Sequence, residues 1–251
     1  MKVSVCMAVY NGEKYIEEQL ASIMPQLGGD DELVISDNYS TDRTLECIGR
    51  FQDGKIKIIS YGNVRSHIYN FENALKHASG DVIFLADQDD IWMPNKIEVM
   101  KPLLETSDLV CSDCQVVDAE GKVLRESYFA MNGCRKGLIK NLIRNNYLGC
   151  CVAFRRRLLR IALPFPGNIV MLDGWIGGLA EIFGTTGFCH EKLIKYRRHG
   201  GNFSTTSEKS TNSLTRKINY RVAMFMELIK RSIQYKFSSA AAPDEERSAA
   251  S

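Results

Sequence analysis

Residues 87–92 of this chain, Asp-Gln-Asp-Asp-Ile-Trp, come directly after the apolar run 81–86, which is typical of a buried strand. Three carboxylates at the end of a buried strand are costly to desolvate unless a positive charge lies beside them. A divalent cation is the natural partner, because Mg²⁺ and Mn²⁺ prefer hard oxygen ligands and are often shared with substrate phosphates. The alternative is a polar turn in which Asp89 or Asp90 caps the helix that begins near Pro94.

The first half of the chain alternates strand-like and helix-like segments. The expected strands are residues 3–9, 32–36, 55–60 and 81–86, and the expected helices are residues 13–24, 45–51 and 70–77. This alternation predicts an α/β fold with a mostly parallel, Rossmann-like sheet flanked by helices. Ligands of such sheets bind at the carboxyl ends of the strands. The polar clusters of this half follow strands, at residues 10–13, 37–38 and 87–90.

The second half of the chain is less regular. Strands are expected around Cys111, at residues 150–154 and near residues 194–196, and helices near residues 138–144 and 175–183. The last residues, 238–251, are rich in Ala, Ser and Glu, and this composition predicts a disordered tail.

Charge and cysteine content argue against several classes of protein. The formal net charge is +2, which does not favour a dedicated nucleic-acid binder. No signal peptide and no apolar run of transmembrane length is evident, so the eight cysteines are expected to be reduced thiols in the cytoplasm. Cys111 and Cys114 have C-x-x-C spacing, but residues three apart on a strand point to opposite faces, which places them poorly for a shared zinc ion.

Residues 213–231 have the pattern of a basic amphipathic helix. Five apolar side chains fall near one stripe: Leu214, Ile218, Val222, Phe225 and Ile229. A helix of this kind can lie on an anionic membrane surface. The alternative is that the stripe packs on the rest of the domain, as amphipathic helices usually do.

Four motifs of the first half resemble, in order and spacing, those of the family-2 glycosyltransferases with a GT-A fold. They are residues 4–16, 35–42, 80–82 and 87–92. Residues 149–155, 173–175 and 196–202 resemble the acceptor-side half of the bacterial polysaccharide branch of this family, in which rhamnosyltransferases are common. The resemblance covers residues 1–205.

The resemblance implies a single GT-A domain at residues 1–205, with a nucleotide-sugar-binding half at 1–100 and an acceptor-side half at 101–205. A basic helical extension at 206–237 and the tail at 238–251 would follow. The implied activity is that of an inverting hexosyltransferase or rhamnosyltransferase. Such an enzyme moves a sugar from a nucleoside-diphosphate sugar to a hydroxyl of a growing bacterial polysaccharide or lipid-linked glycan. It would work in the cytoplasm, with a peripheral contact at the inner face of the cell membrane.

The resemblance places the donor nucleotide around the first strand ends. The residues concerned are Ala8, Tyr10, Asn11, Glu13, Asp37, Asn38, Arg65 and Asp87. Tyr10 would stack on the base, and Arg65 would offset diphosphate charge, although an ordinary surface arginine is the alternative. The family usually has two acids in the second motif, one of which pairs with the base. Here the pair is Asp37 and Asn38, so either the Asp37 carboxylate or the Asn38 carbonyl contacts the base.

The metal ligands implied by the resemblance are Asp89, Asp87 and His199, with Mg²⁺ or Mn²⁺ as the ion. Asp87 would also touch the ribose, and Asp90 would cap or orient. A divalent ion that bridges the diphosphate stabilises the charge that develops on this leaving group. A lone histidine is more often structural, and this is the alternative for His199.

Asp173 is the candidate general base. A carboxylate across the sugar from the leaving diphosphate can take the proton of the attacking hydroxyl, and this geometry inverts the anomeric centre. The alternative is that Asp173 caps the helix through Trp175. Trp92 and Trp175 offer flat faces that suit sugar rings, although packing in the core is the more common role.

Two other functions compete with glycosyl transfer. A nucleotidylyltransferase would need a glycine-rich, cationic loop after the first strand. That loop, residues 10–14, has one glycine and an acid, which weakens this alternative. A non-catalytic nucleotide-binding module would bind metal without needing Asp173. The fold alone does not separate these functions.

Overall fold

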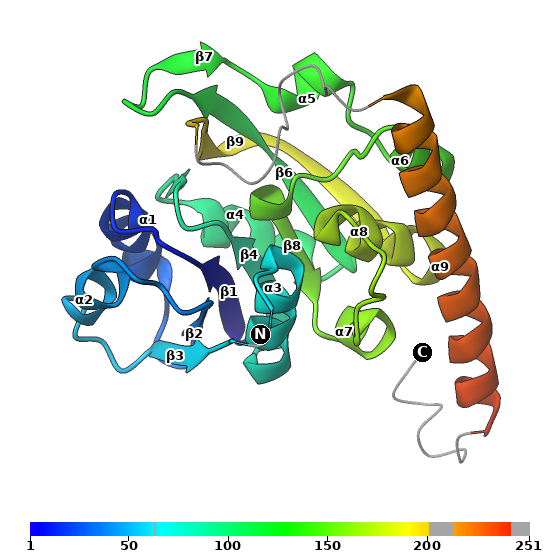
Figure 1. The fold of residues 1–251 in the computed structure, drawn as a ribbon, viewed down its shortest axis with the longest axis horizontal. Helices are drawn as coiled ribbons and strands as arrows, with labels where there is room; N and C mark the ends of the chain where they lie inside the picture. The colour runs from blue at the N-terminus through cyan, green and yellow to red at the C-terminus, as the bar shows by residue number, and fades with distance from the viewer. Residues whose placement is uncertain (63, 201–212, 242–251) are drawn as a thin grey trace.

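A computed structural model describes residues 1–62, 64–200 and 213–241 (Figure 1). Within these residues the strands form one nine-stranded sheet in the order β3-β2-β1-β4-β8-β6-β9-β5, and β7 pairs with β6. The strands are β1 Val3–Val9, β2 Glu32–Asp37, β3 Ile56–Ser60, β4 Val82–Ala86, β5 Ile91–Trp92, β6 Leu109–Val117, β7 Val123–Arg125, β8 Val152–Arg155 and β9 Thr186–Arg197.

Helices surround this sheet. They are α1 Ile16–Ile23, α2 Thr44–Gly49, α3 His67–His77, α4 Lys96–Leu103, α5 Tyr128–Asn132, α6 Leu138–Ile143, α7 Arg157–Ala162, α8 Leu172–Phe183 and α9 Leu214–Ala241, with 3₁₀ turns η1 Met24–Gln26 and η2 Gly149–Cys151. None of these helices is both long and apolar enough to cross a membrane. All eight cysteines are buried free thiols, so the expectation of reduced cysteines agrees with the structure.

The strands β1 to β4 run parallel, as the alternating pattern predicts. β1 pairs with β2 on one side and β4 on the other, and all five residues of β4 are buried. A strand that is covered on both faces has to be apolar along most of its length, which explains the runs at 3–9 and 82–86. The segments that follow β1, β2 and β4 therefore meet at one edge of the sheet.

The second half makes the sheet mixed rather than mostly parallel. β8 lies antiparallel to both β4 and β6, whereas β6 and β9 are parallel to each other. The prediction of parallel strands therefore holds for β1 to β4 and not for the whole sheet. An apolar run predicts a buried strand without fixing its direction, because the pattern of buried side chains is the same either way.

A two-residue strand connects the two halves at the site edge. In β5, Ile91 pairs with Lys195 and Trp92 with Ile194 of β9, in antiparallel register. The Met93 backbone N–H also donates to the Leu193 carbonyl at 3.0 Å. This short pairing places the end of β9 beside the acidic residues that precede β5.

The long helix α9 packs on α6 and α8 with a face that the sequence pattern did not indicate (Figure 1). Met224 and Leu228 are the buried apolar residues among its described side chains, and Leu228 lies over Gly178 of α8. The described members of the predicted stripe are exposed instead: Ile218, Val222, Phe225 and Ile229. The alternative in which this stripe packs on the domain is therefore wrong for these four residues.

The predicted boundaries around α9 overlap with segments outside the described residues. Residues 201–212 and 242–251 are not described, so the start of the predicted extension (206–237) and most of the predicted tail (238–251) are not covered. α9 itself runs from Leu214 to Ala241, which is four residues beyond the predicted end at 237.

Candidate active site

The candidate site lies at the carboxyl ends of β1, β2 and β4. Val9 at the end of β1 is in register with Asp37 at the end of β2. Asp87 follows β4 directly, and β4 pairs with the other side of β1. Tyr10 therefore lies between the Asp37 and Asp87 segments. This is the edge of the sheet at which ligands were expected to bind.

Gln88 ties the loop after β4 to the end of β1. Its side chain accepts a hydrogen bond from the Tyr10 backbone N–H at 2.9 Å and donates one to the Tyr10 carbonyl at 3.1 Å. Gln19 of α1 donates to the Asp87 carbonyl at 2.8 Å. Gly12 makes room for Gln88, because a Cβ added at Gly12 would lie 2.7 Å from Gln88 Oε1. Gln88 is a site residue that had no predicted role.

His199 lies against Asp89, as the predicted metal site requires. The His199 Nε2 atom is 2.8 Å from the Asp89 Oδ2 atom. The Tyr15 ring packs on the imidazole, with the ring centroids 4.8 Å apart. Burial raises the pKa of the Asp89 carboxyl, and the His199 contact opposes this rise. A carboxylate oxygen and an imidazole nitrogen at this separation can share one cation.

Arg197, the last residue of β9, fixes the acidic loop. Its backbone N–H donates to Asp90 Oδ1 and its Nε donates to the Asp89 carbonyl, each at 2.9 Å. Its other guanidinium nitrogens bond the Ala119 carbonyl and the Glu18 carboxylate. Arg197 was part of a predicted motif, but its role as the support of Asp89 and Asp90 was not predicted.

Asp87, Asp90 and Cys150 form a second group of possible ligands, whose ligand atoms all lie within 4.8 Å of one another. Asp90 is fully buried, and its Oδ2 has no hydrogen-bond partner among the described residues. The alternative in which Asp89 or Asp90 caps the next helix is wrong, because Asn95 is the N-cap residue of α4 and no side chain caps it.

The pKa values of Asp87, Asp90 and Cys150 indicate which kind of metal ion this group would bind. Burial and the neighbouring Asp89 charge raise the pKa of Asp87 to about 7, and burial with both neighbours raises the pKa of Asp90 well above its usual range. A divalent cation would relieve this repulsion and satisfy the orphaned oxygen. Burial also raises the pKa of the Cys150 thiol, so that carboxylates remain the natural ligands and the donor set fits Mg²⁺ or Mn²⁺.

Lys96 is a fully buried cation beside the acidic loop. Its Nζ donates to the Cys150 carbonyl at 2.6 Å and lies 3.9 Å from the centroid of the Trp92 ring. Burial lowers the pKa of Lys96 to about 8, while the Asp90 charge opposes this change. Lys96 was not predicted as a site residue, since an isolated lysine near a helix start is ordinarily solvent-exposed.

Asp173 lies in the first turn of α8, and its charge interacts with that of Asp87. Its Oδ1 accepts from the Gly174 backbone N–H at 2.8 Å, and the polar groups of Asn145 and the Gly149 backbone lower its pKa against the effect of burial. Burial raises the pKa of Asp173 to about 6, and its charge contributes to the raised pKa of Asp87. Met171 is the N-cap residue of α8, so Asp173 is not the cap itself.

The two tryptophans belong to the core. Trp175 is fully buried and its Nε1 donates to the Ala162 carbonyl at 3.1 Å. Trp92 is buried against Phe84, with their ring centroids 5.9 Å apart. Neither ring is placed to stack on a sugar at the surface.

The second predicted motif lies next to the end of β1. Asp37 is buried and accepts from the Ser40 backbone N–H and, at 2.5 Å, from the Ser40 hydroxyl. Asn38 donates its Nδ2 to the Tyr61 carbonyl at 2.6 Å. The Asn38 amide nitrogen is therefore committed to the protein, and its Oδ1 is the group left to accept a hydrogen bond from a base.

Tyr10 and Arg65 contact each other at the same edge. The Arg65 guanidinium bonds the Tyr10 hydroxyl and lies 4.4 Å from the centroid of its ring. This contact places a cation beside an aromatic face, as expected for a surface that would receive a base and a diphosphate. Ala8, the remaining backbone position of the predicted donor site, is half-buried near the end of β1.

Asn11 and Glu13 hold neighbouring loops together. Asn11 adopts a left-handed backbone conformation (φ 47°), and its Oδ1 accepts from the Thr41 backbone N–H at 2.8 Å. Glu13 accepts from the Arg43 backbone N–H at 2.9 Å. These contacts give both side chains a framework role between the β1 loop and the loop before α2, and their predicted contact with a nucleotide stays a prediction.

Comparison with known proteins gives a family match over most of the chain. The family described as "Glycosyl transferase family 2" matches residues 4–161. The chain is 27% identical over 169 residues to the Escherichia coli "UDP-Glc:alpha-D-GlcNAc-diphosphoundecaprenol beta-1,3-glucosyltransferase WfgD", covering 65% of this chain and 64% of the relative. It is 36% identical over 118 residues to the Shigella flexneri "dTDP-rhamnosyl transferase RfbG", covering 44% of this chain and 41% of the relative. The chain thus spans less than two thirds of either relative.

A solved structure shares the fold. The crystal structure of S. aureus TarS 1-349 in complex with UDP-GlcNAc superimposes with a TM-score of 0.70 at 19% sequence identity, covering 98% of this chain and 78% of that chain. At this identity the likeness concerns the fold, and it agrees with the mixed sheet and surrounding helices described above.

Proposed function

This chain belongs to glycosyltransferase family 2 and has a GT-A fold, and from that premise we propose that it transfers a sugar, with inversion, from a nucleoside-diphosphate sugar to a hydroxyl of a bacterial polysaccharide or lipid-linked glycan. The observation that carries this proposal is the convergence of Asp87, Asp89, His199 and Asp173 from three separate segments on one edge of the sheet. Family membership decides against the nucleotidylyltransferase alternative.

In this proposal Asp89 and His199 hold Mg²⁺ or Mn²⁺, Asp87 is the third ligand, and the unbonded Oδ2 of Asp90, which is grouped with Asp87, is a further candidate ligand. A bound divalent ion supplies charge stabilisation for the diphosphate leaving group. Asp90 and Arg197 orient the Asp89 loop through the hydrogen bonds that they share. Lys96 offsets part of the acidic charge from the protein side, which limits the cost of burying three carboxylates together.

Asp173 is proposed as the general base. A pKa of about 6 leaves its carboxylate deprotonated at neutral pH while keeping it basic enough to accept the proton of an acceptor hydroxyl. The hydrogen bond from the Gly174 backbone N–H holds one oxygen of the carboxylate, so that the other oxygen is left to face the acceptor. The effect of its charge on the Asp87 pKa supports a position for the base beside the proposed metal ligands.

The donor nucleotide is proposed to lie over the ends of β1 and β2. Tyr10 would stack on the base, and the Arg65 guanidinium beside it would face the diphosphate. Of the two candidates for the base contact, the Asn38 carbonyl is favoured, since its Nδ2 is already bonded to Tyr61 and the Asp37 oxygens already accept from Ser40.

The acceptor is proposed to be lipid-linked, with residues 1–205 forming the catalytic domain and α9 serving as a peripheral membrane contact. The printed name of WfgD describes a diphosphoundecaprenol acceptor, which supports this choice by analogy. Seven large apolar side chains are exposed among those of α9 that the structure describes, namely Ile218, Val222, Phe225, Met226, Ile229, Ile233 and Phe237. Exposed cations accompany this stripe at Arg216, Arg221, Lys230 and Lys236. This combination fits the surface of an anionic bilayer.

The proposed function is tested by a donor screen. Purified protein is incubated with each nucleoside-diphosphate sugar and a short lipid-diphosphate glycan acceptor, with and without Mn²⁺, and release of the nucleoside diphosphate is measured together with the glycosylated product. Acceptor-dependent release from one donor supports the proposal. No product with any donor–acceptor pair, from folded protein that binds Mn²⁺, contradicts it and favours a non-catalytic binding module.

A further inference from the structure

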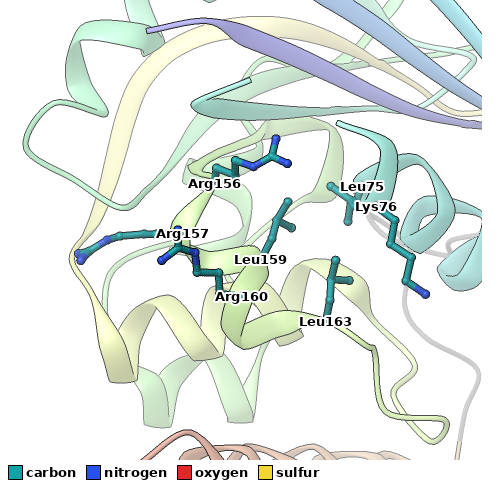
Figure 2. A pocket seen from close by; sticks show the side chains of 7 residues that line it. All are labelled: Leu75, Lys76, Arg156, Arg157, Leu159, Arg160 and Leu163. Atoms are coloured by element: carbon teal, nitrogen blue, oxygen red, sulfur yellow. The ribbon is translucent and has the colours of Figure 1, made fainter. Parts of the chain in front are cut away.

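A cavity of about 480 Å³ lies between the C-terminal end of α3 and α7 (Figure 2). Among the described residues, four cationic and three apolar side chains line it and no acidic one does: Lys76, Arg156, Arg157, Arg160, Leu75, Leu159 and Leu163. A concave surface with a cationic rim is a physical match for an anion, and arginine in particular matches the geometry of phosphate oxygens.

This cavity is separate from the candidate active site. The Arg156 backbone N–H donates to the carbonyl of Asp81, the residue just before β4, at 2.8 Å. Asp87 follows the opposite end of β4, and a five-residue strand is about 17 Å long. The cavity therefore lies at the amino-end edge of the parallel strands, and the donor nucleotide cannot occupy both places.

Two of the four cations are neutralised within the protein. Lys76 pairs with Glu72 and Arg157 pairs with Asp108, each at 2.5 Å, and both acids are nearly buried. The first pair lies within α3 and the second links α7 to the residue before β6, so both of these cations are already balanced by an acid.

The other two cations are not balanced by an acid. Arg156 donates to the carbonyls of Ala78 and Gly80 at the end of α3, which fixes its direction but leaves its charge in place. The Arg160 side chain is exposed and makes no hydrogen bond or ion pair within the part of the chain that the structure describes. Two positive charges thus face the cavity without a negative partner.

The apolar side chains give the cavity a second property. Figure 2 shows Leu75, Leu159 and Leu163 gathered between the two helices, with the cationic side chains around them. A site for inorganic ions alone has no use for such a surface, whereas a phosphate attached to an organic group would contact both parts.

We propose that this cavity binds a phosphate group, with Arg160 and Arg156 contacting its oxygens and the three leucines contacting the organic part of the molecule that carries it. Two sources share this chemistry, a soluble phosphate ester and the headgroup of an anionic phospholipid. The site is independent of the proposed transfer reaction, because it lies at the other edge of the sheet and needs no divalent ion.

The test uses inorganic phosphate as the probe, titrated by calorimetry into the full chain at low ionic strength with EDTA. Arg160→Glu is the test variant, because Arg160 is exposed and its loss leaves no buried partner unpaired. Arg125→Glu on β7 is the matched control for the change in net charge. Arg156 is left intact, since it holds the end of α3.

The proposal expects saturable phosphate binding by the wild type and by Arg125→Glu, with affinity reduced about tenfold or more in Arg160→Glu. Absence of saturable binding by the wild type, or equal affinities in all three proteins, overturns the site. Flotation with phosphatidylglycerol and phosphatidylcholine vesicles then separates the two sources, with the α9 cations Arg216, Arg221, Lys230 and Lys236 changed to Glu in every protein so that α9 does not bind the vesicles itself. In this background, binding to the anionic vesicles that is lost on adding Arg160→Glu identifies the lipid headgroup, whereas vesicle binding that is absent or unchanged by Arg160→Glu identifies the soluble ester. Donor turnover in solution should be equal in all three proteins, so failure of the transfer reaction would not be mistaken for failure of this site.

Discussion

His199 Nε2 lies 2.8 Å from Asp89 Oδ2, although 110 residues separate them in the sequence. The contact exists because β5 pairs with β9 and Arg197 hydrogen-bonds the residues around Asp89. The late histidine is thereby part of the acidic site. The predictions below follow from this arrangement and from the surfaces around it.

Asp173→Asn keeps the size of the side chain and removes the proton acceptor. The rate of transfer should fall by roughly two to four orders of magnitude, while donor affinity changes little. The measurement is the turnover number together with the dissociation constant of the donor in the same buffer. Loss of donor binding with a normal residual rate would instead make Asp173 a donor-site residue.

The wild-type rate should rise with pH through about 6, the pKa to which burial raises Asp173, because the base has to be deprotonated to accept the hydroxyl proton. Below that pH the protonated carboxyl cannot act, and the rate should fall about tenfold per pH unit. The profile is measured under saturating donor and metal. A flat profile between pH 5 and pH 8 would contradict the assignment.

Gly177→Ala should destabilise the fold by about 1–3 kcal/mol. A Cβ at Gly177 of α8 would lie 2.2 Å from the buried Tyr147 ring, which has no room to move because its hydroxyl is bonded to Glu181. The measurement is the urea midpoint at unchanged slope. Gly29→Ala is the control, because a Cβ there meets nothing within 4 Å, and its midpoint should stay near that of the wild type.

Gly12→Ala should weaken donor and metal binding without unfolding the protein. The added methyl would collide with Gln88, whose two hydrogen bonds to Tyr10 hold the acidic loop in place. Binding of Mn²⁺ and of the donor is measured by calorimetry, alongside the circular dichroism spectrum. Unchanged affinities would mean that the loop does not depend on Gln88.

The membrane proposal predicts salt-sensitive binding of the wild type to anionic vesicles. Reversing Arg216, Arg221, Lys230 and Lys236 to Glu should abolish this binding, since each basic residue near the surface is worth roughly 1 kcal/mol. Arg231 is left unchanged, because it is half-buried and bonds the carbonyls of Ile161, Leu163 and Pro164. Donor hydrolysis in solution should be preserved. If the wild type binds no vesicles even at low salt, α9 has another partner.

The strands that are buried on both faces of the sheet could be predicted from the sequence. β1 and β4 are recognisable because strands covered on both faces are apolar along their length. β5 was missed because two residues carry no periodic signal, and yet this strand brings His199 to Asp89. The direction of β8 was not predictable, because the pattern of buried side chains is the same in a parallel and an antiparallel strand.

The site was predicted through side chains that carry chemistry, whereas its supports were not. Asp89 and His199 stand in recognisable motifs and are found in contact. Gln88 and Lys96 act through contacts with distant segments, namely the Tyr10 backbone and the Cys150 carbonyl. Such contacts depend on the tertiary fold, so no local pattern of residues reveals them.

The central claim is that Asp89 binds the divalent ion required for sugar transfer, and it is tested most directly by Mn²⁺-dependent turnover of wild type and Asp89→Ala on the donor found by the screen. Asp89→Ala should be folded, since the change removes a buried charge from a strand end. We expect it to lose both metal-dependent donor binding and transfer, because the variant lacks a ligand charge that the diphosphate cannot replace. Turnover of Asp89→Ala equal to that of the wild type, at ordinary Mg²⁺ or Mn²⁺ concentrations, would contradict the account.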